Sequence, residues 1–513
     1  MAKRKTASEK PKRTGPWAYG VLITLTLLAF APILSSDFLW SEYDEVERTP
    51  FASMEDWTEA WQIDTIRRYD PLTLTSYFLE SYSPLPQPTT HRLINLLLHL
   101  SAALLLLQVL ERLKLRGAYA AALVFALHPA VLQTLYWPGY RNELVGLVFI
   151  LASFYFGIGK RDPRDLILAL VLSFISALLH PAALVLPVLL GLVVFFQHKT
   201  FHLHHYNRIL PIGYVVLCAG VWKHSGQTAA TSPEEISLLT QAGQNVYFYL
   251  RQSLFPLELS LFHPFSEGQT YNVGAANSLL AFVIFIPFYV LIALNFRARW
   301  ARGFFLGLTG FLLLLLYGIM QPGRFVDGSL AKEEHGLYVA LPAIIALVFC
   351  GATGFFGRKK TFGRFLGPAC FGGFLLVHAG LTAAYSYALR DSTQMWQSMA
   401  EQWEEAWQPK AALVASVRST DNDLLSETEM IRTLEAIVEA NPERHEERVH
   451  LARLYRETGQ NAYALREYRR ILRDTEPDDA FLKEAADFFD RVNLSWEADN
   501  ARERIDGAPN SPE

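Results

Sequence analysis

The sequence has few cysteines and little charge for its length. Only three of its 513 residues are cysteines, and charged residues make up 19% of the chain. Cys218, Cys350 and Cys370 each lie within an apolar run and lack the spacing of a zinc site, which argues against a disulfide framework and a zinc finger. The net charge of −4 is small, and nothing in it predicts a nucleic-acid partner.

The N-terminus lacks a signal-peptide cleavage site. Six basic residues precede an apolar stretch from Trp17 to Leu34, as they would in a signal peptide. However, no small-residue cleavage motif follows, and Ser35-Ser36-Asp37-Phe38 is a poor context for cleavage. We therefore expect an uncleaved first transmembrane helix.

Long apolar runs are abundant, and hydrophobic residues make up 51% of the chain although its last quarter is polar. A helix needs about 20 mostly apolar residues to cross the ~30 Å hydrocarbon core of a membrane. The runs predict an all-α, polytopic transmembrane bundle of about eleven spans. The fifth and sixth spans are short and are joined only by His180-Pro181. The predicted spans are 17–36, 90–111, 117–137, 142–159, 164–180, 182–197, 208–223, 277–296, 303–320, 337–356 and 365–389.

Basic residues gather in alternate loops, on the same side as the basic N-terminus. The positive-inside rule makes this side cytoplasmic and leaves the loops 37–88, 224–276 and 321–336 on the outer side. An odd number of spans then places the C-terminal part outside. Compact loops favour a bacterial inner membrane with a periplasmic C-terminal domain, and an endoplasmic reticulum location is the alternative.

The chain changes character at about residue 391. Residues 391–513 are rich in Glu, Arg, Ala and Leu with helical periodicity, and small and aromatic residues recur with a period of 34. This spacing predicts an α-solenoid of tetratricopeptide-like repeats, and an ordinary amphipathic helical bundle is the alternative. The recurring residues are Ala452, Tyr455 and Ala464, followed by Ala486, Phe489 and Ala498.

Acidic residues are concentrated between Asp37 and Glu47, just after the first predicted span. Carboxylates beside a low-dielectric bundle are candidates for a general base or a cation site. The alternative is a solvated acidic loop. Segments 51–66 and 241–257 carry apolar residues at helical spacing and predict amphipathic helices at the membrane interface, where they either anchor the bundle or accompany a lipid-linked substrate.

Other ionisable residues are predicted to meet on the outer side. His128, Arg141 and Glu143 flank the third and fourth spans and suit an anion and a sugar, or else form a structural turn and a local ion pair. Arg251 is suited to phosphate because its planar fork gives bidentate hydrogen bonds, and Glu334 with His335 precedes the tenth span.

Four histidines lie together on the cytoplasmic side, at 198, 202, 204 and 205. A histidine tract can indicate a metal-binding site, but these residues lack accompanying acids or cysteines. We expect no metal site and no cofactor, and a requirement for a divalent cation is left open.

Taken together, several short motifs resemble those of a known family. The likeness covers nearly the whole chain, in motif order and topology as well as in the repeat-containing tail. The chain resembles GT-C-fold membrane glycosyltransferases of the tetratricopeptide-bearing O-mannosyltransferase-like type. The motifs are Phe38-Leu39-Trp40-Ser41-Glu42-Tyr43-Asp44, Tyr69-Asp70-Pro71, His91-Arg92-Leu93-Ile94-Asn95, His128-Pro129, Gly139-Tyr140-Arg141-Asn142-Glu143, Tyr249-Leu250-Arg251, His263-Pro264 and Glu334-His335-Gly336.

The resemblance implies that residues 1–390 form a GT-C-like domain. This domain would transfer a sugar, possibly mannose, with inversion, from a polyprenyl-phosphate donor to a protein or glycan hydroxyl. Glu42 matches the family's catalytic acid, with Asp44 as an alternate, although the family's Asp-Asp pair is replaced by Ser41-Glu42. The residues implied in binding the donor phosphate and sugar are His128, Arg141, Glu143, Arg251, Glu334 and His335.

Two other functions compete with this one. A non-catalytic membrane scaffold with a partner-binding repeat tail would explain the loss of the Asp-Asp pair. A lipid or oligosaccharide transporter is less favoured, because the two halves show no inverted repeat and few charges lie in mid-helix.

Overall fold

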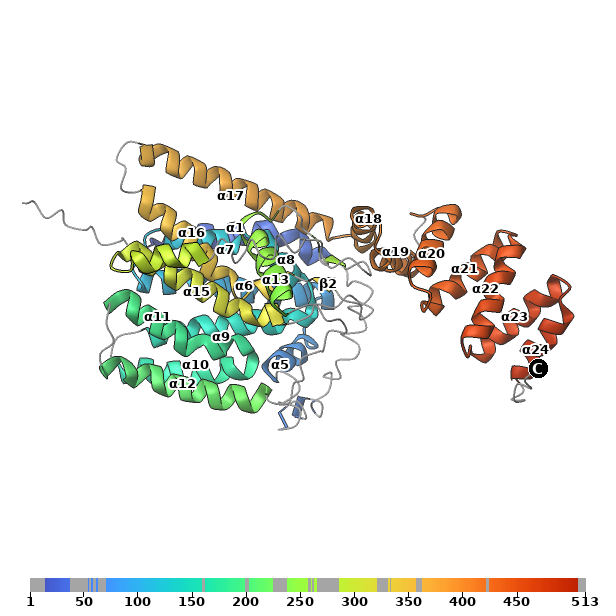
Figure 1. Ribbon diagram of the computed structural model, residues 1–513, viewed down its shortest axis with the longest axis horizontal. Helices are drawn as coiled ribbons and strands as arrows, with labels where there is room; N and C mark the ends of the chain where they lie inside the picture. Colours follow the sequence, from blue (N-terminus) through green and yellow to red (C-terminus); the bar gives the residue numbers. More distant parts are fainter. Residues whose placement is uncertain are drawn as a thin grey trace, which may run out of the picture. The chain divides into compact units, whose positions relative to one another are not determined.

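The computed structural model describes residues 14–36, 54, 57–58, 61–62, 71–158, 162–198, 203–224, 238–256, 260, 263–264, 286–320, 331–332, 334–356, 362–420 and 424–505. These residues are helical apart from turns and one pair of two-residue strands (Figure 1). The chain forms two compact units, Met1–Asp391 and Ser392–Glu513, and each is described by itself.

The helices of the first unit follow the apolar runs of the sequence. They are α1 (Pro16–Phe30), η1 (Ala31–Ser35), α5 (Pro71–Glu80), α6 (Gln87–Arg112), α7 (Ala118–Ala126), η2 (Pro129–Val131), α8 (Leu132–Tyr136), η3 (Pro138–Tyr140), α9 (Arg141–Gly157), α10 (Pro163–Leu179), η4 (Pro181–Val185), α11 (Leu186–His198), α12 (Leu203–His224), α13 (Leu238–Leu254), α15 (Arg299–Met320), η5 (His335–Leu337), α16 (Leu341–Phe356) and α17 (Phe362–Ala388).

Several of these helices are suited to a membrane. Within the described residues, three are long and apolar enough to cross one, at Pro16–Ser35, Gln87–Arg112 and Gly367–Ala388. The bent pair Ala118–Ala126 and Pro129–Tyr136 makes a fourth if it counts as one span. These helices indicate a membrane protein. The number of eleven spans stays a prediction, and residues 277–285 of the predicted span 277–296 lie outside the described residues.

Prolines divide the helices where the sequence places them. The predicted span 117–137 is not one straight helix, because α7 and α8 meet at an angle of 53° around His128-Pro129. Proline has no N–H to donate and its ring clashes with the preceding turn, so a helix cannot run through it undisturbed. For the same reason α10 ends at Leu179, and η4 begins at Pro181.

The helices pack around α9, which lies between α6 and α10, while α15 packs on α16 (Figure 1). Two glycines bring α15 close to η5. A Cβ atom added at Gly318 would lie 3.0 Å from the Cα of Gly336, so only glycine permits this approach. The contact holds the segment that carries Glu334 and His335 against the bundle.

Two short strands join distant parts of the first unit. Strand β1 (His263–Pro264) pairs in antiparallel fashion with β2 (Ala331–Lys332), and His263 lies opposite Lys332. The pairing brings His263 beside the segment that begins at Glu334.

The second unit consists of helices α18 (Ser392–Gln402), α19 (Trp407–Thr420), α20 (Glu427–Ala440), α21 (His445–Glu457), α22 (Asn461–Asp474), α23 (Asp479–Arg491) and α24 (Ser495–Ile505). The small and aromatic residues that recur in the sequence are all buried in its core, at Ala452, Tyr455, Ala464, Ala486, Phe489 and Ala498. Assignment of these helices to tetratricopeptide repeats stays a prediction.

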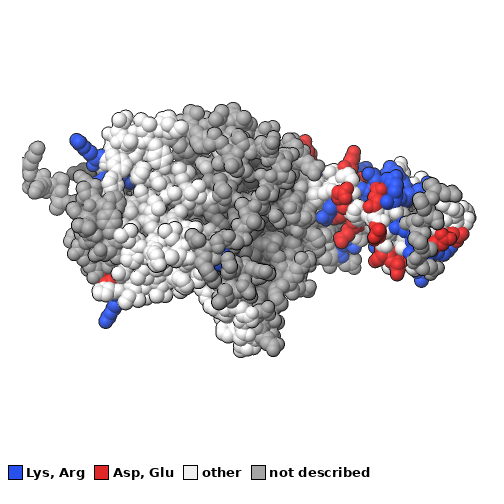
Figure 2. All heavy atoms as spheres, turned by 60° about the horizontal axis from the view of Figure 1, so that its bottom comes forward, with Lys and Arg blue, Asp and Glu red and all other residues white. Residues whose placement is uncertain are grey.

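The two units differ in surface chemistry. Figure 2 shows Lys, Arg, Asp and Glu covering much of the described surface of the second unit, whereas the described surface of the first unit is mostly uncharged. Helix α20 of the second unit also begins with a polar cap, as helices exposed to water often do. Ser426 and Glu429 form a reciprocal capping box at the start of α20. This contrast is expected of a membrane bundle followed by a water-exposed helical unit.

Candidate functional site

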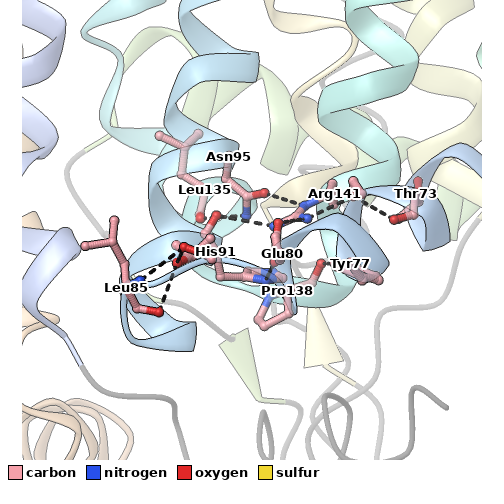
Figure 3. Close-up of polar contacts among 12 residues, drawn as sticks. Thr73, Tyr77, Glu80, Leu85, His91, Asn95, Leu135, Pro138 and Arg141 are labelled. Atoms are coloured by element: carbon pink, nitrogen blue, oxygen red, sulfur yellow. Dashed lines mark hydrogen bonds and ion pairs between the residues drawn. The ribbon is translucent and has the colours of Figure 1, made fainter. Parts of the chain in front are cut away.

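Polar residues gather at one end of the first unit, where α6 and α9 begin and α10 ends. This region is called the polar end. Its best-defined feature is Arg141, the first residue of α9, whose side chain is completely buried (Figure 3). Arg141 Nε donates to Asn95 Oδ1 at 2.8 Å, and Nη1 donates to Ser76 Oγ at 2.9 Å. Nη1 also forms an ion pair with Glu80.

The same cluster fixes α5 against α6. His91 Nδ1 lies 2.8 Å from Glu80 Oε2, and the His91 ring stacks on Tyr77 with centroids 5.3 Å apart. Burial raises the pKa of Glu80, but the His91 hydrogen bond and the Arg141 charge outweigh burial and hold this pKa below its usual value. Glu80 is therefore ionised and pairs with Arg141, so Arg141 is engaged by protein groups on several sides.

A second arginine, Arg92, is also fully buried. Its guanidinium lies over the Tyr136 ring at 4.0 Å, and its Nε donates to Ser36 Oγ at 3.3 Å. Ser36 is the last described residue before the acidic segment that contains Glu42 and Asp44. These two predicted catalytic residues lie outside the described residues.

Two histidines at the polar end share a local motif. His128-Pro129-Ala130 and His180-Pro181-Ala182 each follow a helix, and in both the His Nδ1 accepts the backbone N–H of the alanine, at 3.3 Å and 3.0 Å. This bond caps the 3₁₀ turn begun by the proline and leaves Nε2 as the protonated nitrogen. His128 Nε2 then donates to the carbonyl oxygen of Ser253 at 3.2 Å.

His180 uses its Nε2–H differently. It donates to Glu143 Oε2 at 2.7 Å, and both side chains are buried. Glu143 lies in the first turn of α9, two residues after Arg141. The structure thus separates the predicted local pair, since Arg141 pairs with Glu80 and Glu143 pairs with His180.

Glu334 is the centre of a third buried group. Its Oε1 accepts from Gln252 Nε2 at 3.0 Å and lies 3.3 Å from His263 Nε2. Burial raises the pKa of Glu334 well above its usual value, against the effect of a hydrogen bond from the Ser260 backbone. The half-buried Arg251 precedes Gln252 in α13, so it belongs to the same region.

His335 connects the Glu334 group with the start of α9. Its ring lies parallel to that of Tyr140, with centroids 4.0 Å apart and planes inclined by 9°. Its backbone N–H donates to Gln133 Oε1 at 2.7 Å. Because Tyr140 precedes Arg141, this stack places the predicted residues His335, Glu334 and Arg141 in one neighbourhood.

Hydrogen bonds and one ring stack connect the segments that carry five of the residues predicted to bind the donor, at His128, Arg141, Glu143, Glu334 and His335. The sixth, Arg251, lies next to Gln252 on α13, and it is Gln252 that contacts Glu334. Their roles stay predictions. Sequence reasoning gave no role to the partners Glu80, His91, His180, Gln252 and His263. His91 and His263 belong to motifs that carry the family resemblance, and His180 belongs to a His-Pro pair.

In the described part of the chain, no group of three His, Cys, Asp or Glu side chains is placed to hold a metal ion. The side chains of the histidine tract at 198, 202, 204 and 205 lie outside the described residues. The polar end instead offers buried carboxylates and guanidinium groups beside apolar helices, where charge interactions are stronger than in water. Such an arrangement can bind a ligand that carries hydroxyl groups and a phosphate.

No family model matches the chain, and no curated protein matches it. Among solved structures, the chain is similar to the arabinofuranosyltransferase AftD from Mycobacteria, determined by single-particle cryo-electron microscopy, with a TM-score of 0.40 and 16% sequence identity. The similarity covers 76% of this chain and 28% of that chain, so the present chain spans less than a third of its length. At this TM-score the likeness defines neither the fold nor the activity of the chain.

Proposed function

We propose that the protein is a membrane glycosyltransferase that moves a sugar, with mannose as the first candidate, from a polyprenyl-phosphate-linked donor to a hydroxyl of a protein or glycan. The observation that supports this proposal is the set of polar contacts at the polar end of an apolar bundle, which involve Arg141, Glu143, Glu334 and His335. Arg251 lies on the neighbouring helix α13. A lipid-linked sugar phosphate combines the three chemistries found there, which are an apolar surface, buried hydrogen-bonding carboxylates and arginines.

The proposed reaction is an inverting displacement at the anomeric carbon. Glu42 takes the proton from the acceptor hydroxyl, whose oxygen forms a bond to the anomeric carbon as the bond from that carbon to the phosphate oxygen breaks. The polyprenyl phosphate leaves with the bonding electron pair. Arg251 stabilises the charge that develops on it, together with His335. Asp44 is the alternate base.

The structure modifies the role proposed for Arg141. Its guanidinium is already engaged by Glu80, Asn95 and Ser76. We therefore propose that Arg141 orders the polar end. We propose separately that Arg251 contacts the donor phosphate, because its planar fork can give bidentate hydrogen bonds to phosphate oxygens. Within this scheme the second unit presents the acceptor or a protein partner, because stacked helical repeats create concave binding surfaces.

The proposed setting is a bacterial inner membrane, with the N-terminus in the cytoplasm and both the polar end and the second unit in the periplasm. The positive-inside distribution of loop charges supports this orientation. The second candidate is a non-catalytic scaffold. The observations that favour it are Ser41-Glu42 in place of an acidic pair and the internal pairing of Arg141 with Glu80.

Replacing Glu42 by glutamine is the most direct test of the proposed base. The change keeps the shape of the side chain but removes its capacity to accept a proton at neutral pH. We expect transfer of labelled sugar from a polyprenyl-phosphate donor, measured with purified protein in nanodiscs, to fall by about 10²–10⁴-fold.

The matched control is Glu47→Gln, which removes the same charge from the same acidic segment. It is expected to leave transfer within about twofold, because a charge that does not take part in the reaction acts only through screened long-range electrostatics. Equal losses in both variants would show that the segment acts through its overall charge. Full activity in Glu42→Gln, with loss in Asp44→Asn, would move the base to Asp44.

A further inference from the structure

We infer that His180 is a positioning residue: it holds Glu143 so that one carboxylate oxygen is bound by the protein and the other accepts a hydrogen bond from a hydroxyl group of the transferred sugar. This inference rests on the proposed function and deepens it. It assigns a role to a histidine that no functional motif marked, and it states which class of sugar the site accepts.

The first support is the hydrogen bonding around the two side chains. The Ala182 N–H occupies His180 Nδ1 at 3.0 Å, so the ring proton lies on Nε2 and is donated to Glu143 Oε2 at 2.7 Å. Glu143 is 2% exposed, and among the described residues its Oε1 has no hydrogen-bond partner. His180 occupies Oε2 only, and each oxygen of a carboxylate can accept hydrogen bonds, so Oε1 is suited to accept one from a ligand hydroxyl.

The second support is the space made for the histidine ring. Gly146 lies one turn after Glu143 on α9. A Cβ atom at position 146 would lie 2.8 Å from His180 Cβ and 3.2 Å from its Cγ. Any larger residue would therefore displace the ring. Gly146, Pro181 and the Ala182 N–H together fix where the ring lies, how it is turned and which nitrogen is protonated.

The third support is the contrast with His128. The two histidines have the same His-Pro-Ala motif and the same cap, yet the Nε2 of His128 donates to a backbone carbonyl of Ser253. A bond to a carbonyl oxygen is sufficient to hold a turn. The bond from His180 to a carboxylate therefore adds something beyond capping, namely the orientation of Glu143.

The geometry also limits the ligand. Because the His180 Nε2–H is a donor, Glu143 Oε2 is committed as an acceptor, and Oε1 is suited to an O–H donor rather than to a phosphate or carboxylate oxygen. A neutral sugar with a hydroxyl at the matching position is favoured. A deoxy analogue leaves Oε1 unsatisfied, and a uronic acid places a like charge beside it.

Two substitutions at position 180 separate capping from positioning. Asparagine can accept the Ala182 N–H, as His180 Nδ1 does, but is too short to reach Glu143. Glutamine can extend an N–H₂ toward Glu143 and is poorly suited to the cap. We expect His180→Asn to retain folding and to lower kcat/KM for the donor by about 10-fold to 100-fold, because a hydrogen bond to a charged group is lost. We expect His180→Gln to recover part of this loss.

The deciding experiment is a double-mutant cycle that combines His180→Asn with Glu143→Gln, measured by labelled-sugar transfer in nanodiscs and by thermal unfolding of the full chain. If His180 acts through Glu143, the double variant is no worse in kcat/KM than Glu143→Gln alone. His128→Asn, followed by thermal unfolding only, gives the stability cost of the same cap replacement. Gly146→Ala is an independent way to displace the ring and is expected to resemble His180→Asn in transfer.

Additive losses in kcat/KM would overturn the inference, as would wild-type transfer by His180→Asn. The contact with Glu143 Oε1 can be tested with a series of donors, each of which lacks a different hydroxyl of the sugar. Transfer of every deoxy sugar at the rate of the parent sugar would overturn the proposed contact. Absence of transfer by the wild-type protein with every donor would contradict the proposed function itself. If the wild-type protein transfers sugar and the variants transfer it equally well, the proposed function stands and only the inference about His180 fails.

Discussion

Replacing Arg141 by methionine is expected to lower the free energy of unfolding by about 3–5 kcal/mol, because it leaves the buried Glu80 carboxylate without its cation. Methionine retains much of the apolar stem but none of the hydrogen bonds to Asn95, Ser76 and the His91 carbonyl. Lysine is expected to rescue little of this loss, since a single ammonium group cannot reproduce the planar fork. Thermal unfolding in nanodiscs, followed by tryptophan fluorescence, measures the change.

Arg112 supplies the matched control. It also pairs with an acid, Asp165 at 2.9 Å, but the two side chains are 22% and 20% exposed. Loss of a partly exposed ion pair costs about 0–1 kcal/mol, so Arg112→Met is expected to unfold near the wild-type temperature. Equal destabilisation by the two replacements would contradict the ordering role given to Arg141. It would leave Arg141 available as a direct contact for the donor.

Replacing Tyr468 by alanine is expected to open the second unit. The Tyr468 ring is fully buried and stacks on Phe488 and Phe481, with centroids 4.7 Å and 5.4 Å away, and its hydroxyl donates to Glu484 Oε1 at 2.7 Å. Loss of a buried aromatic ring costs about 3–5 kcal/mol. Hydrogen–deuterium exchange of the full chain is expected to show faster exchange across α21, α22 and α23.

Tyr463 lies on the same helix and is 50% exposed. Tyr463→Ala is therefore the control, because it makes the same replacement at a position that is not buried. We expect it to change the exchange of α22 by less than about 1 kcal/mol in opening free energy. Amides in Tyr468→Ala that stay as protected as in the wild-type protein would mean that the stacked Tyr468 ring does not hold these helices together.

The helices of the first unit were the part that the sequence predicted best. The run predicted at 90–111 corresponds to α6 (Gln87–Arg112), and the run at 164–180 corresponds to α10 (Pro163–Leu179). An apolar run long enough to cross a membrane forms a helix, because each backbone N–H and C=O group must find its hydrogen-bond partner within the segment. Proline positions then predict where such a run divides, although the bend of 53° at Pro129 was not expected.

The partners of the site residues were much harder to predict. A local ion pair between Arg141 and Glu143 is one of the two alternatives that the sequence leaves open, yet α9 directs Arg141 toward α5 and Glu143 toward η4. Residues two apart on a helix point in different directions, so each finds a partner on a different element. Glu80 and His263 belong to segments without strong periodicity, and only tertiary packing places them in the polar end.

Transfer of radiolabelled sugar by the wild-type protein most directly tests the claim that the polar end carries out glycosyl transfer. Purified protein in nanodiscs would be supplied with a panel of polyprenyl-phosphate sugars and a native acceptor extract. The account predicts that the label from at least one donor moves to a protein or glycan in a protein-dependent manner. No transfer from any donor by folded protein, with the acceptor present, would contradict it and would favour the scaffold function.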